Sequence, residues 1–274
     1  MGKLVRRVFA AVGIAALTAA PASLKAQNKD VESVVSSAPV EDATGPSASL
    51  GADVSTGKYG SDESTRTLIF PVSLRVPVAK NLTFLTSLAW IQISGANVVI
   101  GPDGRPTLGI GSNRSTRSGL GDLTLGAVWD VPVKSDHWSI QTSARVKVPT
   151  AARAKVLSSG KPDFAGKLEV TYIAGQLAPF ASVEYQVIGR PEGVDLRNAI
   201  NSSVGFAWIS GKNAFITSYD YNQSTSPLVN GAHSLFGAFS APISDKVRLT
   251  FYGIKGLSTG SADIQAGTSA SFRF

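Results

Sequence analysis

Apolar side chains occupy every second position along much of the chain after residue 46, and this alternation constrains the fold more than any other feature of the sequence. A period of two indicates a β-strand with two different faces, because successive side chains of a strand point in opposite directions. Between Trp138 and Val148 the even-numbered positions are mostly apolar, whereas the odd-numbered positions hold Ser, Gln, Arg and Lys. The same alternation recurs at 68–76, 122–133 and 164–172. We therefore predict an all-β protein.

The alternation predicts twelve strands, near 47–60, 64–78, 81–95, 119–133, 136–149, 163–175, 178–190, 198–210, 213–225, 232–242, 245–257 and 261–274. Short connections, as at 78–81 and 210–213, alternate with longer ones, as at 96–118 and 150–162. An even strand count, with short turns at one end and longer loops at the other, is typical of outer-membrane barrels. We predict a transmembrane antiparallel up-and-down β-barrel over residues 47–274. A soluble sandwich is the alternative, which polar inner faces on so many strands fit poorly.

Aromatic residues support this orientation, because barrels carry aromatic girdles at the two membrane interfaces. Eight of them fall on the expected lipid face near the short-turn end: Phe84, Trp129, Trp138, Tyr172, Trp208, Phe215, Phe272 and Phe274. Tyr59, Phe164, Tyr219 and Tyr221 fall toward the opposite end and are expected to begin the second girdle.

The first 26 residues have the order of a secretory signal peptide: basic residues, an apolar run at 8–20 and then small residues. We expect cleavage after Ala22 or Ala26; an N-terminal core helix is the alternative. Removal of residues 1–26 takes away four basic and no acidic residues, which lowers the formal net charge from +7 to +3. That charge gives no argument for a nucleic-acid partner. Residues 27–46 are polar and small, and we predict a disordered periplasmic linker there.

The last predicted strand ends on Phe274, with Phe272 two residues earlier. This ending resembles the terminal strand by which bacterial outer-membrane barrels are recognised for assembly. We therefore expect Phe272 and Phe274 to form the signal read by the barrel-assembly machinery, and the bacterial outer membrane to be the location of the protein.

Two short motifs, Ser118 to Gly126 (SGLGDLTLG) and Lys147 to Thr150 (KVPT), resemble the family named for the meta-pathway of phenol degradation. The resemblance implies an outer-membrane transporter and extends over most of residues 47–274. The chain departs from the family pattern at Ala151–Ala152, where a Gly-Asp pair often follows, so the loop there is expected to differ. The family supplies no catalytic residues.

The two motifs also predict a pairing between neighbouring strands. If residues 134–135 form a two-residue hairpin turn, Asp122 lies opposite Lys147 and Thr124 lies opposite Arg145 on the inner face. Either a charged constriction or an ion pair that stiffens the wall would result.

Charged residues of both signs recur at inward positions, among them Asp53 and Arg75. We take nine of them as the predicted solute pathway: Asp122, Asp130, Arg145, Lys147, Lys167, Glu169, Glu184, Asp220 and Arg248. A barrel of about twelve strands encloses less space than a porin of 16 to 18, so a narrow path is expected. The loop 96–118 is a candidate constriction, with Arg105, Arg114 and Arg117 facing an anionic solute or lipopolysaccharide phosphates. A solvent-exposed loop is the alternative.

An enzymatic function is not expected from this sequence. Its only histidines are His137, predicted at the periplasmic end, and His233, which has no evident orienting acid nearby. No cysteine is present, and two histidines alone make no convincing metal cluster, so we predict neither a metal site nor a cofactor.

The sequence thus predicts an outer-membrane channel for small solutes. Aromatic or other hydrophobic compounds are implied only by the resemblance to the phenol-degradation family. The expected partners are outer-membrane lipid, lipopolysaccharide and the solute, and we expect a monomer. The alternative function is a barrel with an occluded lumen and a structural or surface-interaction role.

Overall fold

The computed structural model describes residues 45–59, 63–96, 98–100, 106–108, 114–151, 157–192, 195–227 and 230–274. The predicted signal peptide and most of the predicted linker, residues 27–46, lie outside these ranges. The described residues form strands and connections, and none of them belongs to a helix long and apolar enough to cross a membrane.

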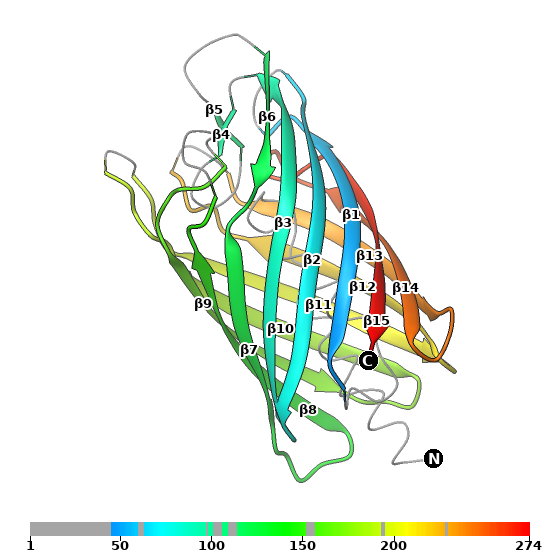
Figure 1. The fold of residues 1–274 in the computed structure, drawn as a ribbon. Helices are drawn as coiled ribbons and strands as arrows, with labels where there is room; N and C mark the ends of the chain where they lie inside the picture. Colours follow the sequence, from blue (N-terminus) through cyan, green and yellow to red (C-terminus); the bar gives the residue numbers. More distant parts are fainter. Residues whose placement is uncertain are drawn as a thin grey trace.

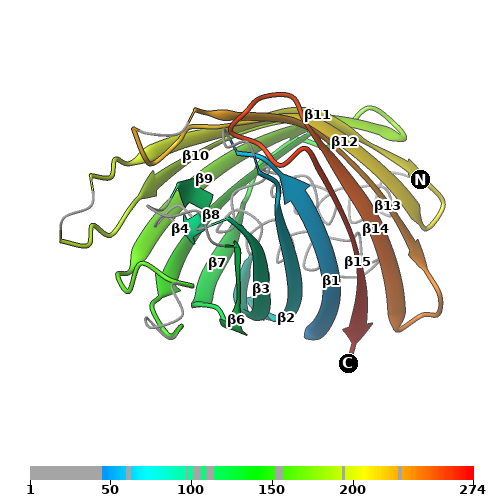
Figure 2. The same ribbon diagram turned by 90° about the horizontal axis from the view of Figure 1, so that it is seen from above.

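The described residues form fifteen strands: β1 (Ser47–Gly57), β2 (Thr65–Ala79), β3 (Leu82–Ala96), β4 (Val98–Ile100), β5 (Pro106–Leu108), β6 (Arg114–Leu120), β7 (Leu123–Val131), β8 (Trp138–Val148), β9 (Asp163–Tyr172), β10 (Leu177–Val187), β11 (Ala199–Ser210), β12 (Asn213–Asn222), β13 (Ala232–Pro242), β14 (Val247–Gly256) and β15 (Ile264–Arg273). β4 and β5 pair only with each other. The rest form one antiparallel sheet, shown from the side in Figure 1 and turned by 90° in Figure 2.

The sheet closes on itself into a twelve-stranded barrel. β1 pairs with β15 on one side and with β2 on the other, so the first and last strands of the barrel are neighbours. β6 and β7 occupy a single place in the wall, because both pair with β3, one above the other. Closure satisfies the backbone hydrogen bonds that an open sheet edge would leave unpaired in lipid. The predicted fold class and strand order are confirmed.

The wall position shared by β6 and β7 contains a β-bulge. Ser87 of β3 lies opposite Thr124, but Trp90 lies opposite Leu120, so the β6–β7 strand has one extra residue between these pairs. Such an insertion turns all the side chains beyond it to the other face of the sheet. Leu120 accordingly faces outward, and Arg117 lies on the inner face across from buried Ile93. The predicted strand 119–133 is therefore interrupted and begins earlier than expected.

The predicted pairing of β7 with β8 is wrong by two residues. Thr124 lies opposite Lys147, and Gly126 lies opposite Arg145. The reason is the turn: β7 ends at Val131 and β8 begins at Trp138, so the connection is wider than a two-residue hairpin. The hydroxyl of Ser135 accepts hydrogen bonds of 3.2 Å from the backbone N–H groups of His137 and Trp138, which stabilises this wider turn.

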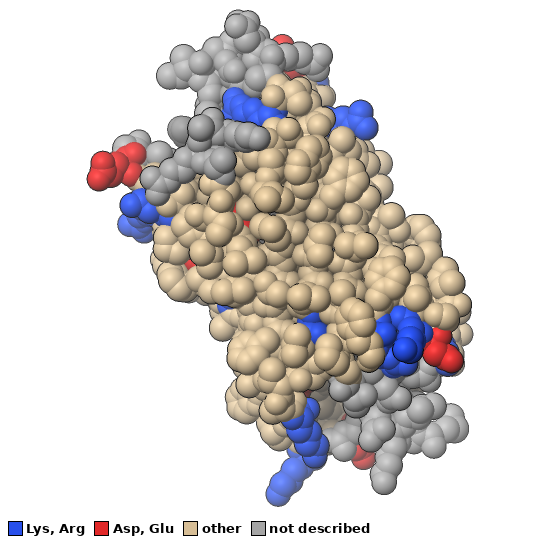
Figure 3. All heavy atoms as spheres, viewed as in Figure 1, with Lys and Arg blue, Asp and Glu red and all other residues tan. Residues whose placement is uncertain are grey.

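The outer face of the barrel is apolar, as expected for contact with lipid. All eight aromatic residues predicted near the short-turn end are exposed there, and Phe164 and Tyr219 are exposed toward the other end. Tyr59 is buried beside Ala262, so its predicted place in the second girdle is wrong. On the face drawn in Figure 3, charged side chains gather mostly toward the two ends of the molecule. The apolar surface between them matches the lipid-facing band of an outer-membrane barrel.

Candidate functional site in the barrel lumen

The strand alternation places all nine residues of the predicted solute pathway on the inner face of the barrel. Five of them are almost fully buried there: Asp122, Glu169, Glu184, Asp220 and Arg248. The others are partly buried: Asp130, Arg145, Lys147 and Lys167. They come from six wall positions, and the fold gathers them into separate groups at different depths. Each group combines charges of both signs or pairs a charge with neutral polar groups.

The largest group lies on β8, β9, β10 and β12. Arg145 forms an ion pair with Glu184, whose other oxygen accepts a hydrogen bond of 3.0 Å from the Asn201 side-chain amide. Lys167 interacts electrostatically with Glu169, Glu184 and Asp220. This group brings together two basic and three acidic side chains from four strands. In a low-dielectric interior, such mutual pairing offsets the cost of removing charges from water.

A second group surrounds the β-bulge near the long-loop end. The ammonium group of Lys147 lies 3.2 Å from the Asp122 carboxylate and 3.0 Å from that of Asp163. Asp163 also accepts a hydrogen bond of 2.9 Å from the backbone N–H of Gly189. The predicted contact between Asp122 and Lys147 is thus present, although their strand register differs from the prediction. Asp163 was missing from the predicted pathway because its run of alternation begins only at that residue.

Two further inward groups lie near the short-turn end. The side-chain amide of Gln141 donates a hydrogen bond of 2.6 Å to Asp130, which also interacts electrostatically with Arg75 of β2. Arg248 donates to the backbone carbonyl of Lys212 at 3.0 Å. These contacts tie side chains to the barrel wall at its expected periplasmic end.

Asp53 forms a separate inward contact about halfway along β1. The hydroxyl of Tyr252 and the side-chain amide of Gln265 donate to one Asp53 oxygen at 2.6 and 2.8 Å. Because Tyr252 is on β14 and Gln265 on β15, the contact ties the last two strands to the first. It therefore reinforces the closure of the barrel from the inside.

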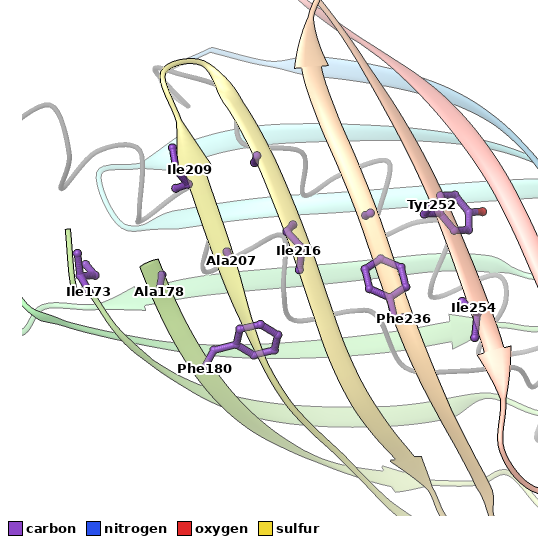
Figure 4. Close-up of a cluster of buried hydrophobic side chains, with 11 residues drawn as sticks. Ile173, Ala178, Phe180, Ala207, Ile209, Ile216, Phe236, Tyr252 and Ile254 are labelled. Carbon is purple, nitrogen blue, oxygen red and sulfur yellow. The ribbon is translucent and has the colours of Figure 1, made fainter. Parts of the chain in front are cut away.

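An apolar cluster covers another part of the inner face (Figure 4). Its buried members come from the strands β10 to β14 and from the turn before β10: Ile173, Ala178, Phe180, Ala207, Ile209, Ala214, Ile216, Phe236, Ala238, Tyr252 and Ile254. The sequence reasoning missed this cluster, because it assigned apolar residues to lipid. The available signal was the set of isoleucines and Phe236 at positions of the otherwise polar inner face. The lumen wall is therefore amphipathic, with an apolar arc beside a charged one.

The segment 96–118 is not a single loop, contrary to expectation. β3 extends to Ala96, β4 and β5 form a small two-stranded sheet, and β6 begins at Arg114. Arg114 and Arg117 thus belong to a strand of the wall, whereas Arg105 lies outside the described residues. Phe272 and Phe274 lie at the end of the last strand, both exposed.

The two histidines occupy separate surroundings. His137 lies in the turn before β8, where its Nδ1 is 3.1 Å from the Ile173 carbonyl. His233 lies on the outer face of β13, with its Nδ1 2.6 Å from the Tyr219 hydroxyl. Among the described residues, no group of three potential ligands is placed to hold a metal ion.

Comparison with known proteins agrees with this architecture. A family model described as "Putative MetA-pathway of phenol degradation" matches residues 44–274. No curated protein matches the sequence.

Among solved structures, an outer membrane channel from Pseudomonas putida F1 is similar with a TM-score of 0.64 at 12% identity, over 84% of this chain and 95% of that one. The transport unit of the autotransporter AIDA-I from Escherichia coli gives 0.52 at 8% identity, over 92% and 97%. The translocator domain of NalP from Neisseria meningitidis gives 0.51 at 9% identity, over 85% and 90%. These likenesses show a shared barrel fold.

Proposed function

The chain belongs to the family described as "Putative MetA-pathway of phenol degradation", and we propose from this membership that it is an outer-membrane channel. We propose further that the channel selects small aromatic or other hydrophobic solutes. A transport role and a location in the bacterial outer membrane follow from the family and the fold. The solute class is the further step. We also propose that the barrel works as a monomer in lipid and lipopolysaccharide, and that the assembly machinery reads Phe272 and Phe274.

The amphipathic lumen wall is the single observation that carries the proposed solute class. Phe180, Ile216, Phe236 and Ile254 place a buried cluster of apolar side chains on the inner side of the barrel wall, where a channel for inorganic ions needs none. Binding sites for small organic molecules are mostly apolar with a few placed polar groups. The charged group around Arg145 and Glu184 supplies such polar groups beside the apolar arc. A solute with an aromatic body and one polar substituent fits both parts.

A barrel with an occluded lumen is the second candidate, and one specific observation favours it. Ion pairs join strands of the wall at two depths. Arg145 pairs with Glu184 across β9, and Lys147 pairs with Asp122 and Asp163. Charges that neutralise one another in this way can cross-link side chains across a lumen. Such a barrel would serve a structural or surface-interaction role.

Single-channel recording tests the proposed function. The chain without its expected signal peptide is refolded into planar bilayers, and the current is measured in salt with and without small aromatic acids and phenols. We expect discrete openings that these compounds block in a concentration-dependent way, whereas glucose, which is of similar size and non-aromatic, does not. A folded barrel with no openings would support the occluded alternative, and equal block by glucose would contradict the aromatic preference.

A further inference from the structure

The described ends of the connection after β8 turn into the barrel instead of projecting away from it. Ala151 and Leu157 are buried in one cluster with Ile69, Ile91 and Ile93. The three isoleucines belong to the inner face of β2 and β3, since their neighbours Leu68, Phe70 and Trp90 lie on the outer side. The described ends of this connection, residues 149–151 and 157–162, therefore lie against the inner wall of the barrel. We call these two pieces the inward segment.

Asp122 holds both ends of the inward segment. One of its carboxylate oxygens accepts a hydrogen bond of 3.0 Å from the Ala151 backbone N–H, and the other accepts one of 2.6 Å from the Ser158 hydroxyl. The side chain is 6% exposed, so water competes little for these bonds. Hydrogen bonds to a buried carboxylate are about twice as strong as those between neutral groups.

Lys147 adds a second set of contacts to the same segment. Its ammonium group donates to the Ser159 hydroxyl at 3.1 Å while it pairs with Asp122 and Asp163. The Thr150 hydroxyl accepts a hydrogen bond of 2.8 Å from the Leu123 backbone N–H, which anchors the start of the segment to β7. The SGLGDLTLG and KVPT motifs thus meet in space, and their polar residues converge on the inward segment.

The bulge at Gly121 makes this arrangement possible. At the bulge the backbone N–H of Gly121 donates to the Ala89 carbonyl at 2.8 Å, and the Asp122 side chain that follows is buried. A Cβ on Gly121 would lie 2.9 Å from the terminal Ile91 Cδ1, so a larger residue here would displace the end of that side chain within the isoleucine cluster. The backbone at Gly121, the Asp122 carboxylate and the isoleucine cluster therefore anchor the inward segment together.

We propose that Asp122 and Lys147 are positioning residues that hold the inward segment inside the mouth of the barrel, where Leu157 narrows the solute pathway and sets its size limit. This inference rests on the proposed channel function. It assigns the constriction to the connection after β8, in place of the segment 96–118 that the sequence suggested. The two family motifs then determine which solutes enter, without touching a solute themselves.

The first test measures the position of the segment without any transport. The chain has no cysteine, so Leu157→Cys introduces a single thiol, which a maleimide-polyethylene glycol probe can label in folded protein. We expect slow labelling in the Leu157→Cys protein and labelling at least tenfold faster when Asp122→Asn is added. The matched control adds Asp245→Asn, which changes an exposed carboxylate in a short turn and leaves the labelling rate unchanged. Equal rates with Asp122→Asn and Asp245→Asn would overturn the positioning role.

The second test measures the pathway itself. We expect Asp122→Asn to raise single-channel conductance about twofold or more and to admit larger neutral sugars into liposomes, whereas Asp122→Glu, which keeps the carboxylate, restores part of the wild-type limit. Faster labelling without any change in conductance would overturn the constriction. If neither protein conducts, the proposed channel function fails, and the labelling result still decides whether Asp122 positions the segment. Heat-modifiable migration in gels verifies that each variant forms a barrel.

A cross-link supplies the converse experiment. Leu157→Cys and Ile91→Cys together place two thiols within the same buried cluster. We expect a short bismaleimide to join them and to keep conductance at the wild-type value even when Asp122→Asn is present. A cross-linked protein that still shows the raised conductance would overturn the assignment of the constriction to this segment.

Discussion

Ionisable side chains inside the barrel are stabilised by their partners, and the Arg145–Glu184 pair is the most direct case. The two side chains are 20% and 10% exposed, so each depends on the other, and Glu184 also depends on Asn201. Loss of one member of a buried pair leaves an uncompensated charge, whereas loss of both removes that penalty. Replacement of one member of the pair should therefore destabilise the barrel more than replacement of both.

We predict that Glu184→Gln lowers the free energy of unfolding by about 3 kcal/mol, because the Arg145 charge then remains buried without its partner. The double variant Arg145→Met, Glu184→Gln should recover most of this loss. Urea unfolding of the barrel in lipid vesicles, followed by tryptophan fluorescence, measures both values. A double variant that is less stable than Glu184→Gln by a further 2 kcal/mol or so would contradict the explanation, since it would show that the arginine stabilises the wall on its own.

For single residues, the sequence predicted which face of the wall each side chain occupies but not which partners it contacts. The inward positions of all nine charged residues followed from alternation alone, because the period of a strand fixes which face a side chain takes. Their partners did not follow, because Asp163, Ser158 and Asn201 reach them from other strands or connections. Thr150 illustrates the same limit: the motif was visible, but its bond to the Leu123 backbone depends on the folded bulge.

At the scale of strands, the apolar outer face predicts that the destabilisation caused by a charged substitution depends strongly on its depth in the membrane. Val204 lies at the centre of β11 and is 57% exposed to the lipid side, whereas Ile200 lies near the long-loop end of the same strand. A charge in the middle of the bilayer cannot reach water, but one near the interface can. The two positions share a strand, a face and an aliphatic side chain, so they form a matched pair.

We predict that Val204→Arg lowers the free energy of unfolding by about 2–4 kcal/mol and that Ile200→Arg lowers it by about 1 kcal/mol or less. Reversible unfolding in bilayers of defined thickness provides both measurements. Similar losses at the two positions would mean that Ile200 also lies within the hydrocarbon core, and the barrel would have to sit higher in the membrane than its girdles indicate.

Strand bounds were largely predictable, and strand registers were not. Eleven of the twelve predicted segments coincide with an uninterrupted strand to within a few residues, because each is a long run of strict alternation. The exception is the wall position of β6 and β7, where Gly121 and Asp122 form a bulge and the inward face changes from even to odd numbers. To predict a bulge, the register with the partner strand must be known. To predict the turn at 132–137, the hydrogen bonds of Ser135 must be known. Neither is contained in local alternation.

For the whole molecule, the amphipathic lumen links the fold to its proposed use. A closed barrel presents every inner strand face to one shared space, so an apolar arc on β10 to β14 and charged groups on β7 to β10 and β12 face that space together. This arrangement was not predictable from the sequence, because an isoleucine at an inner position looks like an irregularity until its neighbours on four other strands are known. The arc is thus a property of the closed barrel.

The arc should contribute directly to the block by aromatic compounds. Ile216 of β12 belongs to the arc on the inner side of the barrel. We predict that Ile216→Ser weakens block by a neutral phenol about tenfold, because loss of the apolar contact made by an isoleucine side chain costs about 1–1.5 kcal/mol. The control is Val204→Ser, which makes a similar change on the lipid face of the neighbouring strand and should leave block unchanged. Block constants are obtained from single-channel currents over a range of phenol concentrations. Equal effects of the two variants would mean that block arises from a general change of the barrel, whereas a selective loss at Ile216 would locate the aromatic compound against the apolar arc.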